Sequence, residues 1–455
     1  MVFAISARVL GDCYIYAGEY KKSEKLLNES LSIFQDNFEE NNFNIITTMV
    51  KLGTLYTRIG DYQLAIKYFE LSREKLPNTN NYAIKNLEQQ ILLNLAYAYR
   101  DLGNIKKATK LLEQALSEFN PPSKKTVTLA IILQELSYLA KANGNYNKSE
   151  SLLEQSLNIY KNHYDDDNIR IAWNITHFGN LYRNTGKYIK SQKVLERSYQ
   201  IYKHNYEINN VKSAWVLVAL GNLHRSVGMH NKAKPLLELA DKIYKKNYGN
   251  NHIRSAWTSG YLGILYHRLG DYHSSKELLE QSLKVHERHF GPNHIRSYWA
   301  KFNLAKTYAK LHRINQAKKL LEESLINYQK FYGNIHQKPA QILLALGRIN
   351  LINNNLDAAE EQFIQSLDIY NMLNHTDAYM SMEALGELHM LRANKELPTS
   401  DLFYSHINSA SNYFKQSLDI TKASLPQKSL YTRIIRKKLH ESLTIQHKSR
   451  LAEFY

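Results

Sequence analysis

Apolar residues recur three and four positions apart along almost the whole chain, which predicts amphipathic helices. Short polar breaks interrupt these helical stretches, and most carry a glycine. The glycines are separated by 42, 43, 41, 42, 42 and 42 residues. A fixed period of this size indicates a stacked array of similar units. The breaks stand at Gly18, Gly60, Gly103, Gly144, Gly186, Gly228 and Gly270, and degenerate to His312-Arg-Ile314 and Asn355-Leu356.

Each unit has the pattern of two helices. Before the break, a stripe such as Phe178-Gly179-Asn-Leu181-Tyr182 sets a small residue beside an aromatic one, which permits close helix contact. After the break, a small residue and an apolar pair recur, as in Ser275 to Leu283. The pattern predicts an all-α array of about ten helical hairpins, held by nearest-neighbour contacts and without one central core.

The residues at fixed places in the units resemble the tetratricopeptide repeat (TPR). In the seventh unit these places hold Leu262-Gly263, Tyr266, Ser275, Leu279 and Ser282. The period exceeds the standard repeat of about 34 residues, and loops such as Tyr248-Gly-Asn-Asn-His252 are similar to the kinesin-light-chain subtype. The resemblance implies a right-handed superhelical solenoid, in which the first helix of each hairpin lines a concave groove.

The array is expected to span residues 1–425, because the small residue of the first helix can be followed from Gly11 to Gly386. The last repeat carries extra residues near 392–403, which we interpret as an inserted loop. The basic segment 426–455 is expected to form a capping helix; a nucleic-acid or membrane-surface role is the alternative. The chain enters its first helix without an obvious cap, which indicates a portion of a longer protein or a chain cut at a domain edge.

Composition excludes several classes of protein. With 44% apolar and 22% charged residues among 455, the chain fits neither a disordered nor a membrane-embedded protein. The sequence contains no run of about 18 apolar residues, so no membrane span is predicted. The 59 Lys and Arg exceed the 42 Asp and Glu, and the net charge of +17 favours acidic partners. A single cysteine, Cys13, excludes an intramolecular disulfide and indicates a cytoplasmic protein; a host-secreted effector is the alternative.

No motif for catalysis, a cofactor or a metal is present: the chain lacks a phosphate loop, a dinucleotide fingerprint and His-Glu-x-x-His. His252, His294 and His336 recur at one loop position. Stacked repeats are about 10 Å apart, however, too far to share an ion whose ligand bonds measure about 2 Å. We therefore expect a protein that is not an enzyme and that needs no cofactor or metal.

A ladder of tryptophan and basic residues is the candidate binding strip. The four tryptophans stand near the start of successive first helices, 42 residues apart, and a base precedes each by three residues. Because residues three and four apart share a helix face, further bases and asparagines are expected on the same surface. The predicted partner-binding residues are Arg170, Trp173, Asn180, Arg183, Lys212, Trp215, Asn222, Arg225, Arg254, Trp257, Arg268, Arg296, Trp299, Lys306, Lys310 and Lys338.

Two interpretations of this strip stay open. In one, the indoles pack between adjacent repeats and the bases are solvated. In the other, indoles and bases together recognise an extended acidic segment with apolar anchors, because Trp and Arg concentrate binding energy at interfaces.

The favoured function is a non-catalytic scaffold or adaptor for an acidic peptide or protein. A ligand-sensing TPR module of a larger signalling protein and a nucleic-acid-binding repeat protein are the alternatives. The mixture of bases with asparagines and histidines disfavours nucleic acid. The sequence leaves the oligomeric state open.

Overall fold

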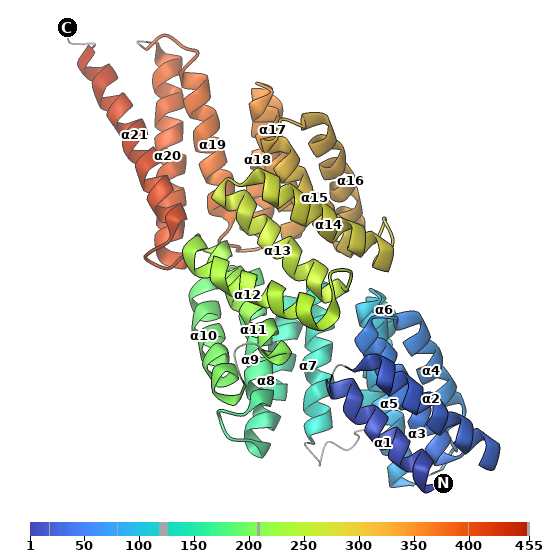
Figure 1. Ribbon diagram of the computed structural model, residues 1–455. Coiled ribbons are helices and arrows are strands. Elements are labelled where there is room, and N and C mark those ends of the chain that lie inside the picture. The colour runs from blue at the N-terminus through green and yellow to red at the C-terminus, as the bar shows by residue number, and fades with distance from the viewer. Residues whose placement is uncertain (18, 80, 118–125, 207–209, 399, 453–455) are drawn as a thin grey trace. The chain divides into compact units, whose positions relative to one another are not determined.

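The computed structural model describes residues 1–17, 19–79, 81–117, 126–206, 210–398 and 400–452, and within these ranges its regular elements are all helices (Figure 1). The first helices of the ten hairpins are α1 (Val2–Ala17), α3 (Phe43–Ile59), α5 (Tyr82–Asp101), α7 (Val127–Ala142), α9 (Ile169–Asn184), α11 (Val211–Ser226), α13 (Ile253–Leu269), α15 (Ile295–Lys310), α17 (Gln337–Ile352) and α19 (Ala378–Ala393). The second helices are α2 (Tyr20–Asn37), α4 (Tyr62–Glu74), α6 (Ile105–Ser117), α8 (Tyr146–His163), α10 (Tyr188–Asn205), α12 (His230–Tyr248), α14 (Tyr272–Phe290), α16 (Ile314–Tyr332), α18 (Leu356–Met372) and α20 (Asp401–Ser424). One further helix, α21 (Leu430–Ala452), follows the tenth hairpin. The predicted all-α repeat solenoid is confirmed.

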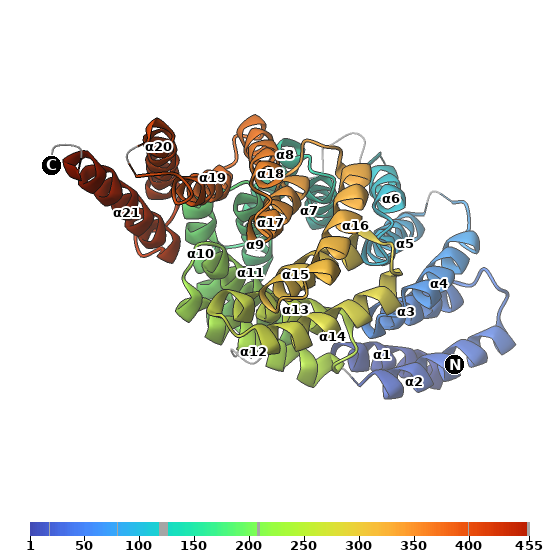
Figure 2. The same cartoon turned by 90° about the horizontal axis from the view of Figure 1, so that it is seen from above.

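The chain divides into two compact units. The first contains residues 1–174 and 245–255, and the second contains residues 175–244 and 256–455, so that the boundaries fall within α9, α12 and α13. In the second unit the first helices α11, α13, α15 and α17 form an inner layer, and α12, α14, α16 and α18 lie outside them (Figure 2). The functional analysis below concerns the second unit.

Close contact inside each hairpin explains the small residues of the repeat. A Cβ added at Gly53 would lie 2.6 Å from Phe69 in the first unit, and one added at Gly179 would lie 2.3 Å from Leu195 in the second. The Ser191 hydroxyl donates a hydrogen bond of 2.7 Å to the carbonyl of Gly179. The glycine therefore admits the bulky residue of the second helix, and the serine satisfies the backbone beside it.

The breaks between paired helices use left-handed backbone. Gly270 has φ +88°, and the two degenerate breaks keep this conformation without glycine, at His312 (φ +58°) and Asn354 (φ +62°). The left-handed region is costly for a residue with a Cβ. The eighth and ninth hairpins therefore keep the turn geometry at the expense of backbone strain.

The recurring loop histidines are the N-cap residues of the helices that follow them. The Nδ1 atoms of His294 and His336 accept hydrogen bonds of 3.2 Å from backbone N–H groups two residues on, and so cap α15 and α17. Aromatic residues four positions earlier stack on them, with ring centroids 5.0 Å apart for Phe290 and 4.0 Å apart for Tyr332. This motif thus has a capping role. Within the described ranges, no group of three or more His, Cys, Asp and Glu residues is arranged to hold a metal ion.

The C-terminal segment packs on the tenth hairpin. Ile435 of α21 is fully buried in one cluster with Leu418 and Leu425, and Lys438 pairs with two glutamates of α19. Some of the extra residues of the tenth repeat belong to α20, which is 24 residues long, and residues 394–398 lie between α19 and α20. A capping role for 426–455 stays a prediction, and residues 453–455 lie outside the described part. No helix in the described part is long and apolar enough to cross a membrane.

Replacing His312 with Gly should remove the cost of the left-handed backbone, about 1 kcal/mol. We expect slower native-state amide hydrogen exchange in α15 and α16, because local opening becomes less favourable. Gly270→His is the matched control, since a Cβ at Gly270 meets no atom within 4 Å and only the backbone changes. That variant should exchange faster in α13 and α14. Equal exchange in both pairs of helices would contradict this account.

Candidate functional site

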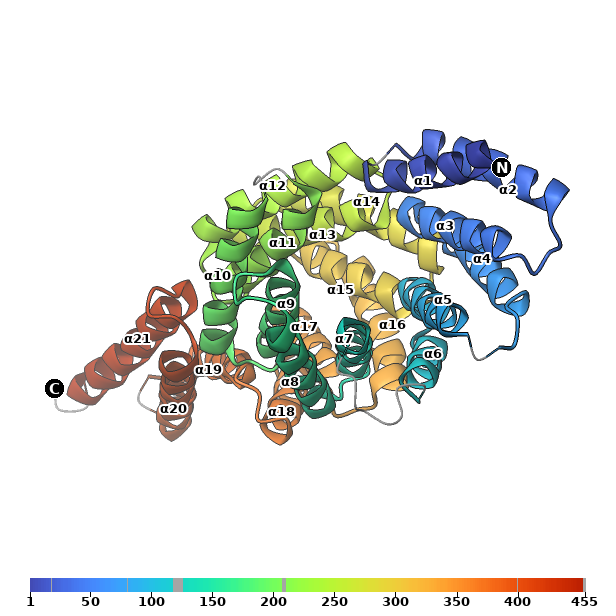
Figure 3. The same ribbon diagram turned by 90° about the horizontal axis from the view of Figure 1, so that it is seen from below.

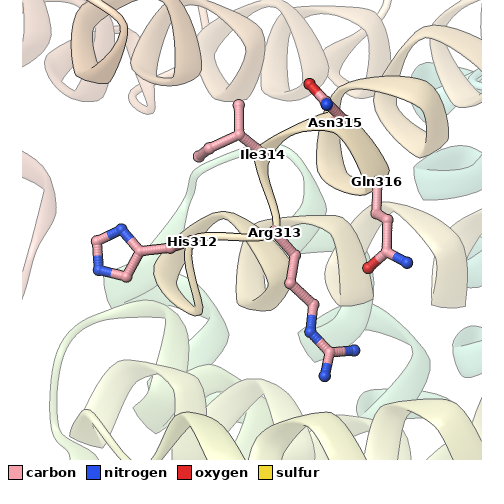
Figure 4. A pocket seen from close by; sticks show the side chains of 5 residues that line it. All are labelled: His312, Arg313, Ile314, Asn315 and Gln316. Carbon is pink, nitrogen blue, oxygen red and sulfur yellow. The ribbon is translucent and has the colours of Figure 1, made fainter.

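An open hollow of about 550 Å³ surrounds the turn between α15 and α16 (Figure 4). Five consecutive residues, 312–316, line it. Their side chains point in different directions and do not meet at one place. The hollow therefore offers no convergent set of groups for a ligand.

The functional site we consider is formed by basic side chains on the inner layer of the second unit. One comes from each of five successive first helices, α9 to α17, and together we call them the cation cluster. The three arginines recur with the repeat period near the ends of their helices, whereas the two lysines come from earlier positions in α15 and α17. The cation cluster consists of Arg183, Arg225, Arg268, Lys306 and Lys338, all of which were predicted from the sequence.

Burial and mutual repulsion disturb the charges of this cluster. Burial, followed by Arg183 and Arg268, lowers the pKa of Arg225 to about 10. Burial, followed by Arg183 and Arg225, lowers the pKa of Lys338 to about 8. Burial and the cations Arg268, Arg225 and Lys338 hold the pKa of Lys306 well below its usual value. Since positive neighbours disfavour a further positive charge, the cluster is a region of excess positive potential.

Water reaches the cluster despite this crowding. Arg268 is exposed, and the other four members are half-buried. Solvent therefore has access to the cluster at Arg268.

Few acids balance these five cations. Asp377 lies near enough to raise the pKa of Lys338, but its carboxylate already accepts a hydrogen bond from the hydroxyl of Tyr188. Glu383 pairs with Lys438 of α21, and also lies 3.9 Å from Arg348. Tyr431, followed by Tyr379, Glu383 and Asp377, raises the pKa of Arg268 against the effect of burial. The pKa values of Arg225, Lys306 and Lys338 stay lowered, so the described acids do not compensate these three cations.

Two asparagines add hydrogen-bonding groups three residues before the arginines. Asn222 Oδ1 accepts a hydrogen bond of 3.2 Å from Arg225 Nε. Asn180 is 8% exposed, and neither its Nδ2 nor the Nε of Arg183 has a hydrogen-bond partner among the described residues. A buried donor without a partner costs about 1–3 kcal/mol. These two groups are therefore available for an acceptor on a ligand.

A neutral histidine lies in the same positive surroundings. Burial, and then Lys306, Arg268 and Lys310, lower the pKa of His267 to about 2. Its Nδ1 lies 3.2 Å from the hydroxyl of Thr307. Lys310 itself is exposed at the end of α15. Lys310, another residue of the predicted strip, thus lowers the pKa of His267 from the edge of the cluster.

Three predicted bases that precede tryptophans lie over other rings. Each covers an aromatic residue six positions earlier, at the end of the preceding helix or directly after it. The cation-to-centroid distances are 4.9 Å for Lys212 over Tyr206, 5.6 Å for Arg254 over Tyr248 and 4.9 Å for Arg296 over Phe290. Arg170 is exposed in the first unit. These residues form no part of the cation cluster.

The tryptophans contact residues of neighbouring repeats. The ring centroids of Trp257 and Trp299 are 4.5 Å apart, and His286 lies 4.6 Å from Trp257. Trp215 lies 6.1 Å from His177 of the preceding repeat. All three indoles are half-buried, as is Trp173 in the first unit. These contacts favour a packing role, and an added role in partner binding stays a prediction.

Sequence analysis missed the residues that reach this site from later hairpins. The Tyr431 hydroxyl of α21 donates a hydrogen bond of 3.4 Å to the carbonyl of Arg225, and its ring lies 5.8 Å from Arg268 Cζ. Asp377 lies in the loop before α19. A repeat period reveals equivalent positions in neighbouring units, but not which distant units meet. Correlated substitutions among related chains are the signal that could reveal such pairs.

The stacked hairpins define a repeat protein whose surfaces are built from equivalent positions. The sequence profile of the tetratricopeptide repeat matches residues 3–77, 87–162, 127–204, 169–246, 212–288 and 296–372. The chain belongs to the tetratricopeptide repeat family, as predicted. This fold supports a scaffold for protein interactions.

Solved structures of similar fold include a Rap protein complexed with Competence and Sporulation Factor. It is 13% identical, with a TM-score of 0.52, and the match covers 89% of this chain and 99% of that one. The apo form of RapI is 12% identical, with a TM-score of 0.45 and coverage of 82% and 98%. A putative kinesin light chain from Podospora anserina, with nearly identical TPR-like repeats, is 19% identical, with a TM-score of 0.36 and coverage of 44% and 96%. No curated protein matches the sequence.

Replacing Trp299 with Ala should remove the ring that packs on Trp257 and that lies within 2.7 Å of a Cβ built at Gly260. We expect a loss of about 3 kcal/mol in local stability, because a large aromatic side chain leaves a cavity. Hydrogen exchange in α13 to α16 would measure it. Tyr82→Ala is the control, since Tyr82 is 83% exposed. Unchanged exchange with weaker partner binding would instead make Trp299 a recognition residue.

Acidification should weaken the array through His286, which is fully buried beside Trp257. Burial lowers its pKa to about 4 in the folded protein, whereas an unfolded histidine titrates near 6.5. The unfolded chain therefore binds the proton first, and the stability present above pH 6.5 is lost as the pH falls from about 6.5 to 4. Urea unfolding between pH 7 and 5 should give a flatter profile for His286→Gln than for His273→Gln, a change at an exposed position. Parallel profiles would contradict the assignment.

Proposed function

We propose that this chain is a non-catalytic scaffold or adaptor that captures an extended acidic peptide, or an acidic segment of a protein, at the cation cluster. The observation that supports this most directly is the crowding of five cations against so little acid. Burial, and then the neighbouring cations, lower the pKa of Arg225 and Lys338, and a negative ligand would offset the repulsion between the cations. We therefore expect affinity for acids because binding would reduce the unfavourable repulsion between cations that exists in the free protein.

The residue types fit carboxylates on an extended chain. Arginine binds a carboxylate through two parallel hydrogen bonds, whereas lysine acts as a point charge. Neighbouring first helices are about 10 Å apart, so successive helices offer cations to successive acidic residues. An apolar ligand group would leave the donors of Asn180 and Arg183 without a hydrogen bond, whereas a carboxylate or a peptide carbonyl would accept from them.

Apolar anchors would contact the inner layer beside the cluster. The half-buried indoles of Trp215, Trp257 and Trp299 retain some exposed surface. The Rap protein of similar fold was crystallised with Competence and Sporulation Factor, and a binding role for the present chain is consistent with that precedent for the fold. The evidence for an acidic ligand comes from this chain's own side chains.

The test uses a fluorescein-labelled peptide of about ten residues in which Glu alternates with Leu and Phe, an extended acidic ligand with apolar anchors. Fluorescence anisotropy should show binding that weakens with salt, because ion pairing with exposed cations is screened. The double variant Arg225→Gln and Lys338→Gln should bind about tenfold more weakly or worse, since charged hydrogen bonds contribute about 1.5–3 kcal/mol each.

The matched control removes two exposed arginines of α21, Arg433→Gln and Arg436→Gln, and so changes the net charge equally. It should bind the peptide as the wild type does. Equal loss in both double variants would indicate nonspecific attraction, and no binding by the wild type would overturn the proposal. Tighter binding of a labelled oligonucleotide than of the peptide would favour the nucleic-acid alternative.

A further inference from the structure

The second unit contacts itself between segments nearly 190 residues apart. Three hydrogen bonds join the turn between α9 and α10 to the loop between α18 and α19, and we call them the closing contact. In Figure 1 α18 and α19 lie above α9 and α10, and in Figure 3, the view from below, α10 lies next to α19. Tyr188 donates to Asp377, His375 Nε2 donates to the carbonyl of Asn184 at 3.0 Å, and the Thr376 hydroxyl donates to the carbonyl of Gly186 at 3.0 Å.

Glycine makes this close approach possible. A Cβ at Gly186 would lie 2.3 Å from Thr376 Oγ1, and one at Gly228 would lie 3.2 Å from the backbone nitrogen of Leu430. At the equivalent Gly270, nothing lies within 4 Å. Gly186 and Gly228, the break glycines of the fifth and sixth repeats, thus have two roles. They turn the chain, and they allow residues of the later part of the chain to approach closely.

An apolar cluster supports the closing contact. It combines Tyr188 of α10 and Leu223 of α11 with Tyr379 of α19, Leu425 after α20 and Ile435 of α21, all buried. Burial of apolar surface stabilises by about 25 cal/mol per Å². The meeting of early and late hairpins is therefore a packed interface as well as a set of hydrogen bonds.

The cation cluster draws members from both sides of this interface. Arg183 and Arg225 come from the early side, in α9 and α11, and Lys338 comes from the late side, in α17. The two arginines lower the pKa of Lys338, so the sides repel each other electrostatically. Asp377, also on the late side, raises the pKa of Lys338 and so partly offsets the effect of the arginines.

We propose that closing of this turn and binding of an acidic ligand at the cation cluster are coupled, because the ligand offsets repulsion between cations from the two sides. This inference rests on the proposed function. By linkage, a ligand that binds the closed turn better must stabilise it. A change that lowers the closed population must weaken ligand binding in proportion to the loss of that population. The site is then complete only in the closed turn.

The distance between the two sides can be measured with spin labels at Lys187→Cys and Asn371→Cys, two exposed positions beside the closing contact, in a Cys13→Ser background. Pulsed electron–electron resonance should give a narrow distance distribution for the otherwise unchanged protein. Tyr188→Phe with Thr376→Val should broaden it, and the labelled acidic peptide defined above should narrow it again. The same pair of changes should weaken peptide binding about fivefold or more, within the range of measured couplings.

Two comparison variants sharpen the result. Tyr272→Phe removes the hydroxyl at the position equivalent to Tyr188 two repeats later, where the adjacent Gly270 has no late neighbour, and should leave the distribution unchanged. Lys338→Gln removes the late-side cation and, when added to Tyr188→Phe with Thr376→Val, should narrow the broadened distribution without any peptide. Circular dichroism checks that each variant keeps its helices.

The outcomes separate the inference from the proposed function. Peptide binding of equal strength to the wild type and to Tyr188→Phe with Thr376→Val, with unchanged distances, overturns the coupling and leaves the scaffold proposal intact. A still broader distribution when Lys338→Gln is added to those two changes also overturns the coupling. Absence of peptide binding to the wild type overturns the proposed function, and the coupling with it.

Discussion

Contact between the two helices of each hairpin is the constraint on which the rest of the structure depends. At positions such as Gly179 the backbone of the first helix comes so near to Leu195 that no side chain fits between them. Every hairpin that keeps this contact has nearly the same internal geometry, and stacking such hairpins brings equivalent residues onto one layer. Arg183, Arg225 and Arg268 follow this repetition, at spacings of 42 and 43 residues, whereas Lys306 and Lys338 come from earlier positions in their helices.

The cation cluster shows how a stable scaffold carries an unfavourable group of charges. Partly burying Lys306 and Lys338 among arginines costs free energy, as their lowered pKa values indicate. A long array tolerates such a cost because its stability is a sum over many repeats. Functional sites are where a protein retains features that do not stabilise its fold.

The fold and the five cations of the site could be predicted from the sequence, because the helices and their faces depend on local patterns. The residues that join the cations from later in the chain could not. The glycine breaks, the small residues and the helix faces gave the hairpins and placed Arg183, Arg225 and Lys338 on one surface. Asp377 and Tyr431 could not be predicted to join them, because their contacts with the early repeats span almost 190 residues or more and follow no period. For the tryptophans, the spacing could not distinguish packing from recognition; the rings of Trp257 and Trp299, 4.5 Å apart, favour packing.

The closing contact also limits how this protein can evolve. In an ordinary repeat array, duplication or loss of one unit changes little beyond the length, since each unit touches only its neighbours. Here the loop that contains Thr376 must meet Gly186, and one unit more or less between them would shift it by about 10 Å. Copy number is therefore fixed from the fifth repeat onward, because the tenth hairpin and α21 also pack on the early side, while the hairpins before the fifth repeat are free to vary in number.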